Sequence, residues 1–320
     1  MSEQDTTARV LGGASGEDRR GRLDRLLRRS PFQPFFRARA AHRLSVLAYH
    51  GVDDRPAFTA QMERLVAGAT PVSLATVERA VTEGRPLPPR SVLVTFDDGD
   101  RTVLTRGLPV LTRLGVPAAA FVVAELVDGD QPFWWREALE LAELGGVARA
   151  LAGVPAASVV RRLKLLPDVE RRAAIEELRA TAARPAARQQ QLSALELLEL
   201  AAAGVAIGSH TLGHPCLDRC EPAVVRTEIE QAHRMLTGWL GVRPTAFAYP
   251  NGNFDAGADA VLRGLGYRLG FLFDHRQDAL LPPHPLRISR LRVNSDTSRD
   301  RFDTILSGLH PAVHRLRGGC

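Results

Sequence analysis

The chain nearly lacks lysine. Lys164 is the only lysine among 42 basic residues in 320, and arginine supplies the other positive charges behind a formal net charge of +6. Heavy arginine use beside abundant alanine, glycine and proline is typical of GC-rich coding, which we favour over nucleic-acid binding as the explanation. No zinc-finger, helix-turn-helix or RNA-binding aromatic pattern is present, so nucleic acid is not an expected partner.

Long apolar runs and a cysteine framework are missing as well. No stretch approaches the ~20 apolar residues that a spanning helix needs, and the polar start has no apolar segment of signal-peptide type. Cys216, Cys220 and Cys320 are too few for a disulfide scaffold, and the spacing of the first two supports no structural zinc without further ligands. The expected location is therefore cytoplasmic.

Residues 1–40 are expected to form a basic, loosely ordered segment without hydrophobic periodicity. Aromatic side chains are interleaved with arginines between Phe32 and Arg39, a composition that can rest weakly on an anionic membrane surface. A solvated tail is the other interpretation, and both remain open.

Strand-like runs alternate with helical patterns over most of the chain. Strands are expected near 45–49, 91–96, 118–123, 205–209, 245–249, 268–273 and 287–293, with helices at 58–68 and 223–239 among others. In the second helix, the expected core-facing residues are Val225, Ile229, Met235 and Leu236, and the expected outward ones are Glu228 and Glu230. Alternation of this kind indicates βα units and a mainly parallel sheet, an α/β fold.

Residues 131–200 interrupt the alternation with helix-forming sequence. We expect a helical insertion that lies over or beside the site rather than an independent domain. It opens on Trp134 and Trp135, whose rings can stack on sugars or pack in a core.

Two adjacent acids end the run Ser91-Val92-Leu93-Val94-Thr95-Phe96, giving the motif Thr95-Phe96-Asp97-Asp98-Gly99. Neighbouring side chains of a strand point to opposite faces, so the two acids share one environment only where the strand stops. The carboxyl ends of strands are where α/β folds gather chemistry. One acid can hold a metal while the other takes a proton from water.

A second strand end supplies histidines in Ser209-His210-Thr211-Leu212-Gly213-His214. The spacing of four places His210 and His214 on one side of a helical turn or tight loop, as in many metal sites. Together with Asp98 they make a two-histidine, one-carboxylate set that can hold a divalent metal with a position open for water.

Two further strand ends carry candidate residues. Tyr249, Pro250 and Asn251 form a turn that can expose backbone N–H groups to an oxyanion. His50 ends another apolar run, in Tyr49-His50-Gly51-Val52. Each is an ordinary turn or structural residue if taken alone, but four reactive strand ends together favour a catalytic site.

These motifs together resemble the polysaccharide deacetylase family, the NodB-homology domains of carbohydrate esterases, over roughly residues 44–309. The resemblance implies a distorted, incomplete (β/α)7 barrel and removal of N-acetyl groups from N-acetylated sugars. It implies that Asp97 is the general base and that Asp98, His210 and His214 bind Zn²⁺, with Co²⁺ or Ni²⁺ as alternatives. The backbone N–H of Asn251 would then help to hold the oxyanion.

The sequence departs from the family pattern at two places. Phe247 stands where the third motif usually has an arginine that orients the catalytic aspartate, and no late Leu-x-His motif supplies a general acid. Tyr49-His50 resembles an arrangement in the subgroup that processes poly-N-acetylglucosamine, which makes His50 the candidate general acid. Arg290 is a secondary candidate for the missing arginine.

The predicted organisation is therefore an amino-terminal segment at 1–40, a deacetylase domain at 41–310 and a tail at 311–320. Two alternatives to the deacetylation of sugar polymers stay open. One is an intracellular deacetylase of a lipid-linked sugar or small natural product, or of another non-peptide amide. The other is a carbohydrate-binding relative without catalysis, which the two departures would favour.

Overall fold

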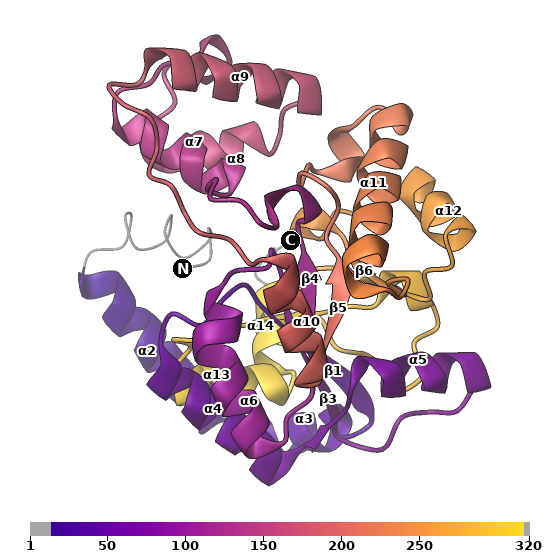
Figure 1. The fold of residues 1–320 in the computed structure, drawn as a ribbon. Coiled ribbons are helices and arrows are strands. Elements are labelled where there is room, and N and C mark those ends of the chain that lie inside the picture. The colour runs from indigo at the N-terminus through magenta and orange to yellow at the C-terminus, as the bar shows by residue number, and fades with distance from the viewer. Residues whose placement is uncertain (1–13, 317–320) are drawn as a thin grey trace.

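A computed structural model describes residues 14–316 of the chain (Figure 1). All seven predicted strand regions contain strand, although several are shorter than expected. The strands are β1 (Arg43–Tyr49), β2 (Thr70–Pro71), β3 (Ser91–Phe96), β4 (Ala118–Val122), β5 (Val205–Ser209), β6 (Ala246–Ala248), β7 (Leu269–Phe271), β8 (Asp278–Ala279) and β9 (Leu291–Arg292).

The strands form a curled, mainly parallel sheet in the order β7-β6-β5-β4-β3-β1-β8, with β2 beside β3 and β9 beside β1. Among the strands of the described residues, only β8 pairs antiparallel, with β1. The segment that contains β9 also reaches the opposite edge, because Ile288 bridges Phe271 of β7. Residues 288–292 therefore lie between β1 and β7 and connect the two sides of the sheet. This confirms the expected distorted, incomplete (β/α)7 barrel.

Side-chain alternation divides the apolar residues into an inner and an outer layer. Inside lie Leu44, Val46, Leu93, Phe121 and Phe271, with the apolar face of α5 (Leu74–Glu83). Their strand neighbours pack outside against helices. Asp97 and His210 continue the inward alternation beyond the ends of β3 and β5, so both side chains are brought to the same mouth of the barrel.

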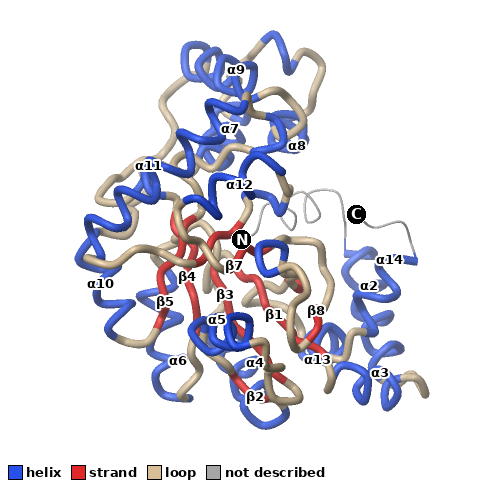
Figure 2. The backbone as a smooth tube through the Cα atoms, turned by 90° about the vertical axis from the view of Figure 1, so that its right-hand side faces the viewer, coloured by secondary structure: helices blue, strands red, loops and turns tan. Residues whose placement is uncertain are grey.

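Helices surround this sheet (Figure 2). The predicted helices at 58–68 and 223–239 correspond to α4 and α11. The helices outside the insertion and the termini are α4 (Arg55–Gly68), α5, α6 (Leu108–Leu114), α10 (Ala194–Ala202), α11 (Pro222–Leu240), α12 (Ala256–Gly264) and α13 (Arg299–Leu306).

The insertion comprises α7 (Trp134–Glu143), α8 (Val159–Leu163) and α9 (Asp168–Thr181), which stand above the barrel in both views (Figures 1 and 2). It has an apolar cluster of its own, which includes Leu141, Leu163 and Leu178. Helix α10 does not belong to it, because Leu197 and Leu200 pack in the outer core of the barrel. The insertion therefore ends before α10 and not at residue 200.

Loose order was the wrong expectation for residues 14–40, which form α2 (Ala14–Arg28) and α3 (Gln33–Ala40). Ion pairs tie α2 to α13: Arg28 reaches Asp300 at 2.5 Å and Asp303 at 3.3 Å. Asp303 also pairs with Arg64 of α4. These contacts join the segment to elements far along the chain, and hydrophobic periodicity does not predict such contacts. Residues 1–13 lie outside the described part.

The expected tail from residue 311 is also partly helical, because α14 spans Leu309–Leu316. Residues 317–320, with Cys320, lie outside the description. His275 holds this helix: its Nε2 and the Nδ1 of His310 are 2.9 Å apart, and its Nδ1 accepts the Arg292 N–H at 3.0 Å. Burial, together with the charges of His310 and His314, lowers the pKa of His275 from 6.5 to about 2.

We expect this histidine to make the protein less stable in mild acid. The folded chain keeps His275 neutral, whereas the unfolded chain takes up a proton below pH 6.5. Its contribution is therefore complete above that pH and falls by up to about 1.4 kcal/mol per pH unit below it. We therefore expect the unfolding free energy, measured with urea, to fall less steeply from pH 7 to pH 5 in His275→Asn than in wild type. Asparagine is chosen because it tolerates the positive φ of 57° at this position. The exposed His284→Asn is the control; equal slopes in all three proteins would contradict this role.

Candidate metal centre and catalytic site

The turn after β3 brings the two acids to one side. Asp98 has φ 70° and Gly99 has φ 83°, so the backbone turns sharply where the strand ends. The N–H of Asp97 donates to Tyr49 O at 2.8 Å, and the carbonyl of Asp98 accepts from Val123 N–H at 3.3 Å. The left-handed turn removes the alternation that would otherwise separate the side chains, and both carboxylates are buried.

The two histidines come from β5 and the loop that follows it. His210 Nδ1 lies 2.7 Å from Ala248 O, which fixes the ring with Nε2 toward the acids. Thr211 and His214 have φ of 67° and 57°, and Thr211 Oγ1 accepts the His214 N–H at 2.9 Å. The spacing of four is therefore realised in a tight loop and not in a helix.

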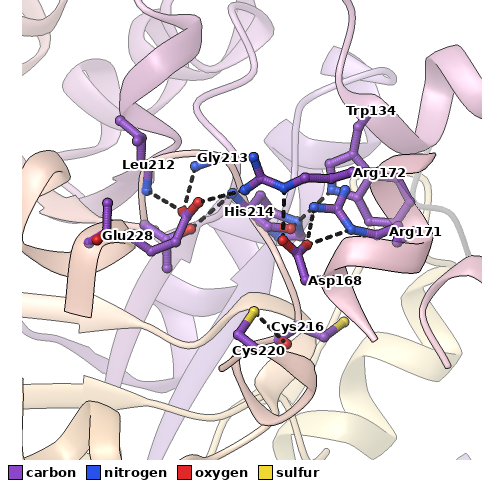
Figure 3. A network of polar contacts seen from close by, with 12 residues as sticks. Trp134, Asp168, Arg171, Arg172, Leu212, Gly213, His214, Cys216, Cys220 and Glu228 are labelled. Atoms are coloured by element: carbon purple, nitrogen blue, oxygen red, sulfur yellow. Dashed lines mark hydrogen bonds and ion pairs between the residues drawn. The ribbon is translucent and has the colours of Figure 1, made fainter. Parts of the chain in front are cut away.

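Glu228 supports this loop, contrary to the expectation that it faces solvent. It is 3% exposed, and its Oε2 accepts the N–H groups of Leu212 at 3.1 Å and Gly213 at 2.8 Å. Its other oxygen accepts from Arg172 of the insertion at 3.2 Å (Figure 3). Helical periodicity predicts which residues face inward but not that a polar loop lies there, so the sequence missed this residue.

Asp98, His210 and His214 offer ligand atoms within 4.8 Å of one another. Each histidine Nε2 lies 3.5 Å from Asp98 Oδ1, and that oxygen is buried without a hydrogen-bond partner among residues 14–316. An unpartnered buried carboxylate oxygen facing two imidazoles fits a divalent cation. Neither Cys216 nor Cys220 joins this group, and burial raises the pKa of Cys220 to about 12.

The charges around the site favour the protonation states that a cation requires. Burial alone raises the pKa of Asp98, but the imidazoles of His50, His210 and His214 outweigh it and lower the pKa. Burial and the neighbouring His210 hold the pKa of His214 well below 6.5. At neutral pH the set therefore presents a carboxylate and a neutral imidazole, the forms that bind metal.

Arg290 holds Asp97 in the way expected of the arginine that the third motif lacks at Phe247. It is fully buried, and its two terminal nitrogens donate to the two oxygens of Asp97 at 2.6 and 2.7 Å. Its Nε donates to Leu272 O at 2.6 Å. Burial raises the pKa of Asp97, but Arg290 and then His210 produce a net lowering. Phe247 packs in the outer core with Tyr249, so its side chain points away from the acids.

His50 lies in the same site. Its charge is the largest of the influences that lower the pKa of Asp98, and it also acts on Asp97 and His214. The ring makes an edge contact with Phe273 at 5.4 Å, and its Nδ1 has no hydrogen-bond partner among the described residues. The geometry is compatible with the predicted general acid, a role that stays a prediction.

Of the three residues in the predicted substrate and oxyanion turn, Asn251 is the candidate backbone donor, and contact of the turn with substrate stays a prediction. The side chain of Tyr249 packs in the outer core, and its N–H donates to Phe271 O at 3.0 Å. Pro250 has no N–H. Asn251 has φ 58° within the short turn Pro250–Gly252, which leaves its N–H as the candidate donor to an oxyanion.

The paired tryptophans enclose His214. Trp135 is 4% exposed and lies with its ring 4.4 Å from that of His214. Trp134 donates from Nε1 to His214 O at 3.0 Å, while Arg171 stands over its ring at 4.5 Å. Of the two expectations, packing is the one that fits Trp135. Trp134 is half-buried and stays a candidate for sugar contact.

Removing Glu228 should weaken metal binding although it touches no metal. Glu228→Ala leaves two buried N–H groups of the histidine loop without their acceptor, and loss of such support typically costs about 10- to 100-fold in metal affinity. The dissociation constant, measured by competition with a chelator, checks this. Glu230→Ala, two residues along α11, should bind metal as wild type does. Equal affinity of both variants would contradict the supporting role of Glu228.

Two acids and two histidines at the mouth of a curled βα barrel are the arrangement expected of a metal-dependent hydrolase. The family model of polysaccharide deacetylases matches residues 84–270, more than half of the chain. The chain belongs to the polysaccharide deacetylase family.

Solved structures with the same fold include IcaB from Ammonifex degensii and the Streptococcus pyogenes deacetylase PplD in complex with acetate. The first is 21% identical, has a TM-score of 0.58 and covers 83% of this chain and 96% of its own. The second is 18% identical, has a TM-score of 0.59 and covers 82% of this chain and 98% of its own.

A curated relative in sequence is the poly-β-1,6-N-acetyl-D-glucosamine N-deacetylase of Escherichia coli K12. It is 41% identical over 61 residues, which are 19% of this chain and 9% of the relative. The match therefore covers only a small part of that protein.

Proposed function

We propose that this protein is a metal-dependent hydrolase that removes N-acetyl groups from N-acetylated sugars in a polysaccharide, oligosaccharide or glycan precursor. The observation that carries the proposal is the buried Asp98–His210–His214 set beside Asp97, which is itself held by Arg290. A protein that merely binds sugar has no chemical need for an oriented base next to a metal set. Membership of the deacetylase family supports the same reaction.

Each residue of the site has a separate role in the proposed reaction. Asp98, His210 and His214 hold the cation, for which we propose Zn²⁺, with Co²⁺ or Ni²⁺ as alternatives. When bound, such a cation polarises the amide carbonyl and lowers the pKa of water. Asp97 accepts the proton of the attacking water, because Arg290 keeps it ionised and oriented. The Asn251 N–H donates to the developing oxyanion, and His50 protonates the departing amine.

A solvent-open groove lies beside the candidate site, and none of the metal or catalytic candidates lines it. It has a volume of about 460 Å³ and lies between the turn after β3 and the flanks of the insertion. Charged and amide side chains line it, among them Asp100, Arg101, Arg136 and Gln189. Charged and amide side chains can exchange hydrogen bonds with sugar hydroxyls, so the groove gives secondary support to a carbohydrate substrate.

The amino-terminal helices support weak contact with an anionic membrane. Leu26, Phe32 and Phe35 are between 63% and 68% exposed, and exposed arginines such as Arg25 and Arg37 lie beside them in the sequence. Apolar and basic side chains together favour such surfaces. Sedimentation with anionic and neutral vesicles tests this membrane contact. Wild type should sediment with anionic vesicles more than Phe32→Ser/Phe35→Ser does, and equal sedimentation of the two proteins would contradict the contact.

None of the described helices has both the length and the apolar character required to cross a membrane. The cytoplasmic location and the absence of nucleic-acid binding stay predictions, which cell fractionation and a binding titration with DNA and RNA would test.

Acetate release from three probes tests the proposal. Zinc-loaded protein is given a β-1,6-linked N-acetylglucosamine oligomer, its β-1,4-linked counterpart and an N-acetylglucosamine monosaccharide conjugate. Release from an oligomer is the expected result. Release from the monosaccharide conjugate alone would favour the small-molecule or lipid-linked alternative. Binding of an oligomer without any release would favour the non-catalytic relative.

A further inference from the structure

We propose that Lys164, contributed by the helical insertion, is a positioning residue for the Asn251 oxyanion turn. The inference rests on the proposed deacetylation, because it assigns a role within that site. Lys164 is the single lysine in a chain that otherwise uses arginine for positive charge. It lies directly after α8, and its side chain contacts the loop at Asn251, 87 residues further along the chain.

The insertion holds the stem of Lys164 in place. Its N–H donates to Val160 O at 3.0 Å, continuing the turn of α8. Leu163 and Leu166 on either side are buried in the cluster that the insertion forms for itself. The lysine is therefore a half-buried side chain on a packed support and not a free surface chain.

The ammonium group of Lys164 contacts the side chain of Asn251. Its Nζ donates to Asn251 Oδ1 at 3.1 Å. The amide of Asn251 in turn lies 3.4 Å from Asn253 Oδ1, and Asn253 donates to Asp218 at 2.8 Å. A charged donor thus anchors one end of a hydrogen-bonded row along the turn. Such an anchor favours the left-handed conformation at Asn251 that sets the direction of its N–H.

The positive charge of Lys164 acts through Asn251, because its Nζ lies 3.1 Å from Asn251 Oδ1. A compact ammonium suits the single oxygen of Asn251, whereas a planar guanidinium favours two acceptors.

The insertion also reaches the histidine loop, which makes it part of the site. Trp134 donates to His214 O, and Arg172 bridges Asp168 to Glu228, the acceptor of the loop N–H groups (Figure 3). Lys164 extends this support to a second loop. One inserted unit therefore contacts both the metal-ligand loop and the oxyanion turn.

Steady-state acetate release tests the role of Lys164. Lys164→Met should lower kcat roughly 10- to 100-fold, the usual effect of losing a charged hydrogen bond in the transition state, with KM changed less than about twofold. Lys164→Arg should restore part of the loss. Metal content and the urea midpoint should stay as in wild type.

Asn251→Gly provides the matched background, because glycine keeps the positive φ and the N–H but removes the side-chain acceptor. In that background Lys164→Met should cause no further loss of kcat. Additive losses, or a raised KM with unchanged kcat, would overturn the positioning role. A wild type that releases no acetate would instead overturn the deacetylation, so the two failures are distinguishable.

The single lysine gives an independent measurement of the contact. Reductive methylation with ¹³C-formaldehyde labels Lys164 and the amino terminus of the chain, so two sets of methyl signals are expected. The Lys164 signal should shift in Asn251→Gly, while the terminal signal stays constant. An unchanged Lys164 signal would contradict the contact, whatever the activity.

Discussion

Replacing Arg290 with methionine is expected to cost about 3–5 kcal/mol of unfolding free energy, because it leaves a buried carboxylate without its partner. Arg290 and Asp97 are both buried and share two hydrogen bonds of 2.6 and 2.7 Å. The variant should also lose activity on the acid side of the pH profile. Without the guanidinium, the pKa of Asp97 rises, so the base becomes protonated at a higher pH.

Urea unfolding and the pH dependence of kcat/KM measure these two effects. Arg290→Lys is the control, since it keeps the charge but not the paired geometry. It should remain folded and show an intermediate shift of the acid limb. An Arg290→Met protein that unfolds at the wild-type urea concentration, or keeps the wild-type acid limb, would contradict the assignment of Arg290.

Asp97→Asn is expected to lower acetate release by about 10²- to 10⁴-fold, the usual contribution of a general base. Bound metal should remain, because Asp97 is not part of the metal set. The neighbouring Asp98→Asn provides the matched contrast, since it replaces the ligand carboxylate with a neutral amide and should lose metal and activity together.

Rates and metal content measured on the same preparations separate the two acids. The urea midpoint is needed as well, because Asp97→Asn leaves Arg290 buried with a neutral partner. A folded Asp97→Asn protein that retains wild-type turnover would contradict its role as base. Equal metal loss in both variants would contradict the division of roles.

The sequence predicted the parts of the site that local patterns encode. Asp97 and Asp98 end a strand, and His210 and His214 follow another, so the parallel sheet brings them together at one mouth. The barrel followed from the same alternation of strands and helices, sharpened by the family resemblance.

Residues that act through distant contacts were harder to predict. Glu228 lies on a helix whose periodicity gives no sign that a polar loop needs an acceptor for two N–H groups. Arg290 was only a secondary candidate, because nothing local shows that β9, which directly follows it, closes the barrel beside β1. Lys164 is distinctive in composition alone, and no local pattern connects it with Asn251, which lies 87 residues further along the chain.

Metal content is the most direct test of the central claim, because it needs no knowledge of the substrate. Elemental analysis of purified wild type, with added zinc, cobalt or nickel where needed, should give close to one divalent ion per chain. His214→Ala should bind little or none under the same conditions. A wild type that takes up none of the three metals, or a His214→Ala variant that is fully metallated, would contradict the account.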